Sequence, residues 1–175
     1  MAQASHNEIG KNGVKSASDH QFLTFMLAGN EYGVDILSVQ EIRGWEQVRP
    51  LPDAPDFVCG VMNLRGEVML VVDLRKRFGL EAQAYSATTV VIIVHVTDGD
   101  AERGMGLVVD AVSEVYAIQP KNMRPPPRLG NGVRSEMLKG VAMVEKEMVF
   151  VLDLQKLVSH EVLDTIPDED SAVDG

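Results

Sequence analysis

Residues 58–77 read VCGVMNLRGEVMLVVDLRKR, and residues 138–157 read LKGVAMVEKEMVFVLDLQKL. At an offset of 80 residues, which places Gly60 on Gly140, the two stretches share seven identities in twenty positions. Composition predicts roughly one or two such identities by chance. The chain therefore contains two related structural units, although the first has Arg65 where the second has Glu145. Because a shared fold does not require that arginine, the difference indicates a contact made by the first unit.

The repeat extends upstream at an offset of 73 residues. Identical residues recur there, and conservative pairs accompany them: Gly33, Val39, Glu41 and Ile42 fall on Gly106, Val112, Glu114 and Val115. A repeat of this length is typical of duplicated subdomains or stacked units, and two copies indicate a pair rather than a solenoid. Each unit has about 60 to 70 residues, which is small for an independent core, so we expect the units to pack together.

Composition excludes several classes of function. The 175 residues carry a formal net charge of −10 without a basic stretch, which argues against nucleic acid as a partner. A single cysteine, Cys59, excludes an internal disulfide and is typical of a reducing compartment; we interpret it as a small core residue. Val90–Val94 is far too short to span a bilayer, and Met1–Ser18 lacks the apolar region of a signal peptide. These features predict a cytoplasmic protein without direct membrane insertion.

Short β-prone runs separated by turn residues fill most of the chain. We expect one hairpin from Phe22–Leu27 and Tyr32–Val34, and another from Phe57–Leu64 and Val68–Val72 with Arg65 at its turn. Further strands are predicted at Thr88–Val96, Met105–Val109 and Met148–Leu152, and short helices at Leu74–Phe78 and Leu154–Val158, capped by Asp73 and Asp153. For Asp35–Ile42 and Asp110–Val115, helical turn and strand remain alternatives. The pattern predicts an all-β protein of two small five- or six-stranded barrels.

The expected organisation has three parts. Residues 1–20 form a disordered arm, residues 21–160 form the double-barrel domain with units at about 21–87 and 88–160, and residues 161–175 form a tail with six acidic and no basic residues.

A catalytic or metal site is not supported by the sequence. The four histidines are scattered, without metal-ligand spacing to each other or to Cys59, and phosphate-binding glycine motifs are missing. A double barrel that binds a small molecule is another alternative. Aromatic residues that could stack on a ligand are few, however, and Trp45 is the only tryptophan. We therefore expect no enzymatic activity, no cofactor and no metal.

Four motifs together resemble the CheW family of chemotaxis coupling proteins: YGVDI at residues 32–36, VQEIRG at 39–44, GVMNLRG at 60–66 and VVDLR at 71–75. The resemblance covers about Gln21 to His160. It implies two intertwined SH3-like, five-stranded β-barrels without catalytic activity. It also implies an adaptor that couples the cytoplasmic tip of methyl-accepting chemotaxis receptors to the regulatory domain of the histidine kinase CheA, in ternary signalling complexes and membrane-bound arrays.

The resemblance also implies a set of receptor-binding residues: Val39, Glu41, Ile42, Gly60, Arg65, Gly106, Val112, Val115 and Gly140. Alternatives remain for most of them. The four aliphatic residues could be core instead of lining a groove for a receptor helix, and the glycines could serve backbone geometry. Arg65 could form an internal ion pair with Glu67 or Asp73 instead of binding a partner carboxylate or carbonyl.

Overall fold

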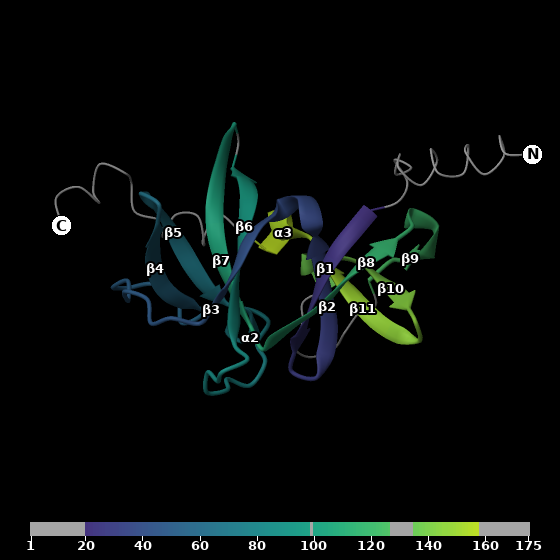
Figure 1. Ribbon diagram of the computed structural model, residues 1–175, viewed down its shortest axis with the longest axis horizontal. Helices are drawn as coiled ribbons and strands as arrows, with labels where there is room; N and C mark the ends of the chain where they lie inside the picture. The colour runs from purple at the N-terminus through teal and green to yellow at the C-terminus, as the bar shows by residue number, and fades with distance from the viewer. Residues whose placement is uncertain (1–19, 99, 127–134, 158–175) are drawn as a thin grey trace, which may run out of the picture.

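The computed structural model describes residues 20–98, 100–126 and 135–157, and strands dominate it (Figure 1). The expected N-terminal arm and acidic tail lie outside the described residues, except that His20 is the first residue of a strand. The described helices have three or four residues each, and none has the length and hydrophobicity of a membrane-spanning helix.

The elements follow in the order expected for two repeats of one pattern. The first repeat contains β1 (His20–Leu27), β2 (Asn30–Asp35), η1 (Ile36–Ser38), β3 (Val39–Gly44), β4 (Val58–Leu64), β5 (Glu67–Asp73) and α2 (Leu74–Arg77). The second contains β6 (Val90–Asp98), β7 (Ala101–Val109), β8 (Ala111–Ile118), η2 (Pro120–Asn122), β9 (Met123–Arg124), η3 (Ser135–Met137), β10 (Leu138–Val144), β11 (Glu147–Leu152) and α3 (Leu154–Leu157).

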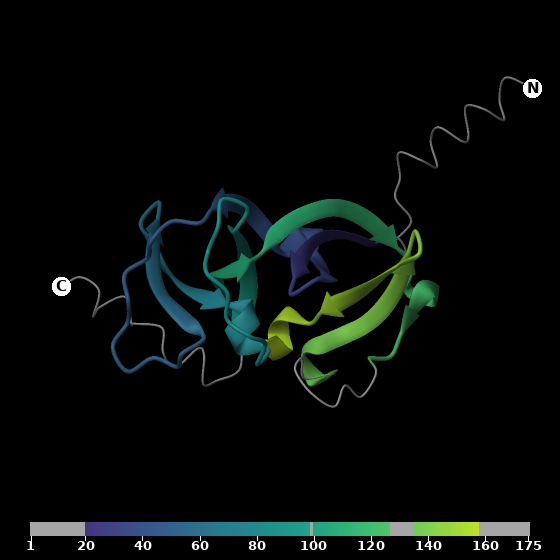
Figure 2. The same cartoon turned by 90° about the horizontal axis from the view of Figure 1, so that it is seen from below.

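Two sheets lie side by side, and each takes strands from both repeats (Figures 1 and 2). Sheet A has the order β8-β1-β2-β11-β10-β9, and sheet B has the order β3-β6-β7-β5-β4. The chain therefore crosses between the sheets at η1 and again at Asp110, and the sequence boundary at residues 87 and 88 separates the repeats but not the sheets. The two units are intertwined.

The exchange follows an internal pseudo-symmetry. Leu23 of β1 pairs with Val115 of β8, and the corresponding pair in sheet B is Ile92 of β6 with Ile42 of β3. Each sheet also contains one parallel pair of strands, which is β11 with β2 in sheet A and β5 with β7 in sheet B. The same residue pattern thus forms the same register twice, with the partner strand supplied by the other repeat.

The all-β class is confirmed, with strand numbers within the five or six expected from the pattern, and two details differ from the five-stranded barrels implied by the resemblance. Sheet A has six strands, because Met123–Arg124 adds to the outer side of β10. Among the described residues no pairing joins the outer strands of either sheet, so the ladders curve without closing.

One apolar core lies between the sheets and draws on both. Phe25 and Tyr32 of sheet A, together with Leu70, Ile92 and Leu107 of sheet B, belong to the same buried cluster. The opposite face of sheet B is covered as well, by a second cluster that includes Val71, Ile93 and Trp45. Because both faces of these strands are buried, their sequences are continuously apolar rather than alternating.

The two ambiguous segments have different structures. After Asp35, whose Oδ1 accepts a hydrogen bond from Leu37 N–H (2.9 Å), the chain forms the single turn of η1 and continues as β3. The equivalent segment after Asp110 enters β8 directly. The predicted helix caps are confirmed: Asp73 Oδ1 accepts from Arg75 N–H (2.9 Å), and Asp153 Oδ1 accepts from Gln155 N–H (3.1 Å).

Candidate functional site

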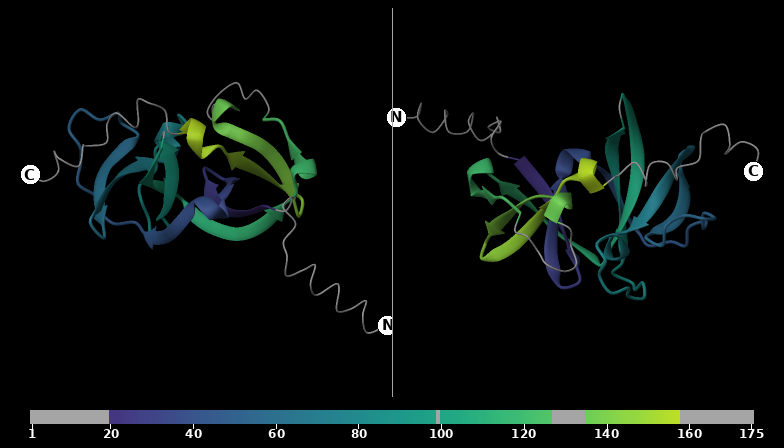
Figure 3. Two further views of the ribbon diagram at one scale, coloured as in Figure 1. Left: turned by 90° about the horizontal axis from the view of Figure 1, so that it is seen from above. Right: turned by 180° about the vertical axis from the view of Figure 1, so that it is seen from behind.

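Strands β3 and β8 occupy equivalent positions and carry the aliphatic residues of the candidate site. Both lie along the same side of the molecule, one in each sheet (Figure 2, and Figure 3, left). Val39 and Val112 are half-buried and pack against the shared core, whereas Ile42 and Val115 are 44% and 47% exposed. Core packing therefore accounts for one residue of each pair, and the other presents apolar surface to solvent.

Each of the two strands contains a β-bulge between the half-buried and the exposed residue. The pairing of β3 with β6 shifts between Val39 and Glu41, and the pairing of β8 with β1 shifts at the equivalent place, between its Val112 and Val115 pairs. In β8 the bulge is fixed by Thr24, whose hydroxyl donates to the Glu114 carbonyl (2.9 Å) and accepts from Glu114 N–H (3.1 Å). Residues three positions apart in a regular strand point to opposite faces, but the bulge keeps both residues of each pair on the face of the shared core, because Val94 and Ile92, like Phe25 and Leu23, all belong to that core.

Arg65 lies in the tight turn that joins β4 to β5. Its φ is +53° and that of Gly66 is +90°, the combination found in two-residue type I′ hairpin turns. Asn63 Oδ1 accepts a hydrogen bond from Gly66 N–H (2.9 Å) and stabilises the turn. A left-handed conformation is unfavourable for a residue with a Cβ atom. Arg65 therefore occupies a position at which its own conformational preference is unfavourable.

The turn brings Arg65 next to Glu41 of β3. Arg65 Nη1 lies 3.3 Å from Glu41 Oε1, and the ion pair connects the β4–β5 hairpin to the opposite edge strand of sheet B. This oxygen is buried and lacks a hydrogen bond of regular geometry, while the arginine side chain is 70% exposed. This oxygen of Glu41 is thus shielded from solvent, whereas most of the Arg65 side chain remains accessible.

The internal partners considered from the sequence, Glu67 and Asp73, are engaged elsewhere. Glu67 Oε1 accepts from Gly104 N–H of β7 (3.0 Å), and Asp73 caps α2. The partner of Arg65 was not expected from the sequence, because Glu41 lies 24 positions before it. The two residues come into contact because the sheet is curved.

The second repeat has a different charge at the equivalent place. Its turn contains Glu145 and Lys146, both with positive φ, so the turn geometry is retained while the arginine is replaced by an acid. Partial burial, followed by the carboxylates of Glu114 and Glu31, raises the pKa of Tyr116 in this region. The two repeats therefore differ in charge, with Arg65 beside Glu41 in the first and acidic groups around Tyr116 in the second.

Gly60 and Gly140 permit the close approach of another backbone. Gly60 has φ +150°, and a Cβ atom there would lie 2.1 Å from the carbonyl oxygen of Arg49. A Cβ atom on Gly140 would lie 2.5 Å from Met123 Cγ and 2.6 Å from the Arg124 carbonyl oxygen. Both glycines lie at a shift of strand register and thus serve backbone geometry, the alternative considered from the sequence.

Gly106 lies apart from the surface. It is buried in β7, where a Cβ atom would lie 2.8 Å from Val91 Cγ1. The structure therefore brings together Glu41 and Arg65, places Ile42 on the other face of the same strand and Val115 on the equivalent strand, and leaves Gly106 in the interior.

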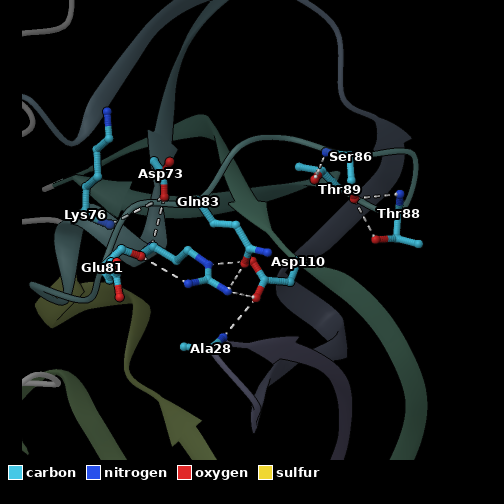
Figure 4. Close-up of polar contacts among 10 residues, drawn as sticks. Ala28, Asp73, Lys76, Glu81, Gln83, Ser86, Thr88, Thr89 and Asp110 are labelled. Atoms are coloured by element: carbon cyan, nitrogen blue, oxygen red, sulfur yellow. Dashed lines mark hydrogen bonds and ion pairs between the residues drawn. The ribbon is translucent and has the colours of Figure 1, made fainter.

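A further polar cluster, at the crossing from sheet B to sheet A, was not expected (Figure 4). Arg75 of α2 donates to both carboxylate oxygens of Asp110, from Nε (2.8 Å) and from Nη2 (2.6 Å). Asp110 Oδ2 also accepts from Ala28 N–H in the β1–β2 turn (2.9 Å). Arg75 additionally donates to the Glu81 carbonyl (3.0 Å) and to Gln83. We call Arg75 and Asp110 the crossover clamp.

The clamp affects both of its charged groups. The hydrogen bond with Asp110 raises the pKa of Arg75. Burial alone would raise the pKa of Asp110, but hydrogen bonds from Arg75 and Ala28 N–H outweigh it and lower the pKa. The sequence contained a signal for this cluster, because Arg75 and Asp110 fall on Gln155 and Leu37 in the repeat alignment. Like Arg65, both are charged residues that the other repeat does not have.

The side-chain cluster closest in composition to a catalytic site contains Cys59, Asp73 and Tyr85. Tyr85 donates its hydroxyl hydrogen to Asp73 Oδ2 (2.8 Å) and lies 3.4 Å from Cys59 Sγ, while its ring packs against Trp45. Burial raises the pKa of the Cys59 thiol, which disfavours the nucleophilic thiolate. This arrangement stabilises the connection between the repeats and lacks an activated nucleophile.

Two surface cavities have volumes of about 270 and 230 Å³. Both have mixed linings: the larger combines charged residues such as Arg43 with Val48, Val61 and Met62, and the smaller combines Asp35 and His95 with leucines. Both volumes lie below the range of about 300 to 1,000 Å³ that is typical of small-molecule sites. Among the described residues, no group of three or more His, Cys, Asp or Glu side chains could hold a metal ion.

Comparisons with known proteins agree on one family. Residues 21–162 match the family model of the CheW-like domain. The chain is 40% identical over 141 residues to the chemotaxis protein CheW of Klebsiella aerogenes, covering 81% of this chain and 82% of that protein. It is 34% identical over 154 residues to CheW of Treponema pallidum, covering 85% and 88%.

A solved relative agrees in fold. The structure of the scaffolding protein TtCheW from Thermoanaerobacter tengcongensis superposes with a TM-score of 0.74 at 31% identity, covering 82% of this chain and 95% of that one. Sequence and structure together place this chain in the CheW family of chemotaxis proteins.

Proposed function

We propose that the protein is a non-catalytic chemotaxis adaptor that couples methyl-accepting chemotaxis receptors to the histidine kinase CheA. In this proposal it binds the cytoplasmic tip of the receptor and the regulatory domain of the kinase, and it forms ternary signalling complexes and arrays. The observation that carries the proposal is the exposed pair Ile42 and Val115 on equivalent strands, with the partly exposed Arg65–Glu41 ion pair at the residue that precedes Ile42 in β3.

The receptor-binding surface would use apolar contacts for affinity and the ion pair for orientation. A helix from a receptor tip can place an apolar face against Ile42 and Val115 while polar groups at its edge meet Arg65. The guanidinium has five donors in a planar array, and the single contact with Glu41 leaves others available to a partner. Since the second repeat has Glu145 in this position, a helix would meet opposite charges at its two sides, which favours one orientation.

Other exposed apolar residues supply surfaces for additional partners. Leu37 of η1 is 86% exposed, and we assign it to the kinase-binding surface of the first repeat. Met143 and Met148, which pair across the β10–β11 hairpin, are 58% and 49% exposed in the second repeat. We assign this hairpin to a second kinase domain in an array. Separate surfaces allow receptor and kinase to be bound together.

A non-catalytic role is supported by the chemistry of the polar clusters. The crossover clamp contains two groups of complementary charge whose pKa shifts stabilise the charged forms, which suits a structural role better than proton transfer. The Cys59 thiol is held away from its reactive form. Cytoplasmic localisation, with recruitment to membrane-bound receptor arrays, follows from the proposed partners.

Binding experiments with separate and combined partners test the proposal. A receptor cytoplasmic fragment and a CheA regulatory domain are each expected to bind the full chain, and capture of one through the other should require it. Arg65→Ala should lower receptor-dependent kinase stimulation, whereas Arg124→Ala, which removes an exposed arginine from β9, should not. The proposal is contradicted if neither fragment binds, or if both variants stimulate the kinase equally.

A further inference from the structure

The crossover clamp lies where the chain passes from sheet B to sheet A. Asp110 is the single residue between β7 of sheet B and β8 of sheet A. Its backbone N–H donates to the Met26 carbonyl (3.1 Å), and its carboxylate accepts from Ala28 N–H, so it is held at two points of sheet A. Arg75 extends from α2, directly after β5 of sheet B, to the same carboxylate. The clamp thus joins one sheet to the other through charged hydrogen bonds.

The other crossing lacks an equivalent. There the repeat alignment places Leu37 at the position of Asp110 and Gln155 at the position of Arg75. In the orientation that satisfies both its amide atoms, Gln155 bonds the backbone of Thr97 (3.0 and 3.1 Å), while Leu37 is 86% exposed. A neutral amide therefore replaces a charged bidentate pair, and its partner is backbone rather than a side chain of the crossing segment. Within the described part of the chain, this crossing thus has no charged side-chain pair equivalent to the clamp.

We propose that Arg75 is a positioning residue, which through Asp110 sets the orientation of sheet A relative to sheet B and hence the spacing between β3 and β8. Asp110 immediately precedes β8, two residues before Val112 and five before Val115. A rotation at Asp110 would move these residues relative to Ile42 on β3. The link to partner binding rests on the proposed function, whereas the link to sheet orientation does not.

Two further features support a role in orientation. The Arg75 side chain is only 13% exposed, so its ion pair is screened less than a pair on the surface. Arg75 also fixes residues 81 to 83 of the connection between the repeats, which limits the freedom of that segment next to the crossing. The shared core keeps the sheets in contact without the clamp, so its loss should widen the range of orientations rather than unfold the protein.

The test measures the distance between the sheets. Spin labels are placed on the exposed residues Ala101 of β7 and Met148 of β11, through Ala101→Cys and Met148→Cys in a Cys59→Ala background. Double electron–electron resonance then compares the parent with Arg75→Gln, Arg75→Lys and the control Lys76→Gln, which removes the same charge from the neighbouring exposed residue of α2. Thermal unfolding and receptor-fragment affinity are measured on the same proteins without labels.

Arg75→Gln should broaden the distance distribution and weaken receptor-fragment binding by about threefold, the change expected when the binding-competent fraction falls to about one third. Arg75→Lys should give intermediate values, because lysine keeps the charge but cannot donate to several acceptors at fixed angles, and Lys76→Gln should match the parent. An unchanged distribution in Arg75→Gln would overturn the proposal, even if the melting temperature falls. If the distribution broadens but the parent itself does not bind receptor, the orientation role stands and the proposed function fails.

Discussion

Replacing Arg65 by asparagine should separate the stability of the protein from its function. Asn-Gly is the preferred dipeptide of a type I′ turn, because asparagine tolerates a left-handed conformation better than arginine does. At this position φ is +53° and the next residue is already Gly66. The substitution therefore improves the turn while it removes the guanidinium.

The same substitution also removes the ion pair with Glu41, which lowers the free energy of unfolding. Two unit charges 3.3 Å apart attract by about 1 kcal/mol in water. With the arginine side chain 70% exposed and hydrogen-bond geometry lacking, the net contribution to stability is at most about 1 kcal/mol. The improved turn offsets a loss of this size, so the free energy of unfolding of Arg65→Asn should lie within about 1 kcal/mol of the parent.

Urea denaturation and kinase stimulation in reconstituted receptor arrays provide the assays. A double-mutant cycle with Arg65→Asn and Glu41→Gln gives the coupling energy between the two side chains. We expect a small coupling in the free protein and a loss of receptor-dependent stimulation. A coupling above about 2 kcal/mol, with stimulation retained in any variant that folds, would refute the reasoning, because Arg65 would then be a structural residue.

Other expectations follow from the same contacts. Gly60→Ala should destabilise the fold by more than about 3 kcal/mol in urea denaturation, because its Cβ atom would collide with backbone, whereas Gly66→Ala, which has open space, should cost only about 1 to 2 kcal/mol; equal effects would contradict the close-approach argument. Because folding lowers the pKa of Asp110, its carboxylate stabilises the folded protein at pH values above its unfolded pKa of about 3.9. This stabilisation is lost as the pH falls through the lower pKa of the folded state. Asp110→Asn should therefore flatten the acid side of a stability profile, and an unaltered profile would count against the clamp. Alkylation of Cys59 at about pH 8 should be much slower in native than in denatured protein, since burial raises the thiol pKa; equal rates would show an accessible thiolate.

Local patterns predicted the elements of this fold well. Both hairpin turns, the caps at Asp73 and Asp153, and the continuously apolar β6 were recognisable because each depends on neighbours in the chain. Partner exchange between the repeats could not be derived in the same way. Duplicated strands present nearly the same pattern of residues, so periodicity does not distinguish pairing within a repeat from pairing across repeats, and the intertwining was expected from family resemblance alone.

The candidate site was predictable where the repeats differ. The replacement of Arg65 by Glu145 identified a residue that the structure leaves largely exposed. The same criterion, applied to Arg75 and Asp110, would have found the crossover clamp. That Arg75 and Asp110 contact each other could not be predicted, because a contact between residues 35 positions apart depends on how the two sheets pack. The common face of Val39 and Ile42, and of Val112 and Val115, was equally hidden, since residues three positions apart share a face only when a bulge lies between them.

Strand exchange has an evolutionary implication. A lone ancestral half, with β1 and β2 ready to pair with strands that lie in another copy, would have gained its full set of neighbours by dimerising. Fusion of two such genes would turn that dimer into a monomer, after which each half could diverge under its own selection. Cleaving the present chain between β5 and β6 should recreate the earlier situation, in which neither fragment folds alone and mixing the two restores a native complex.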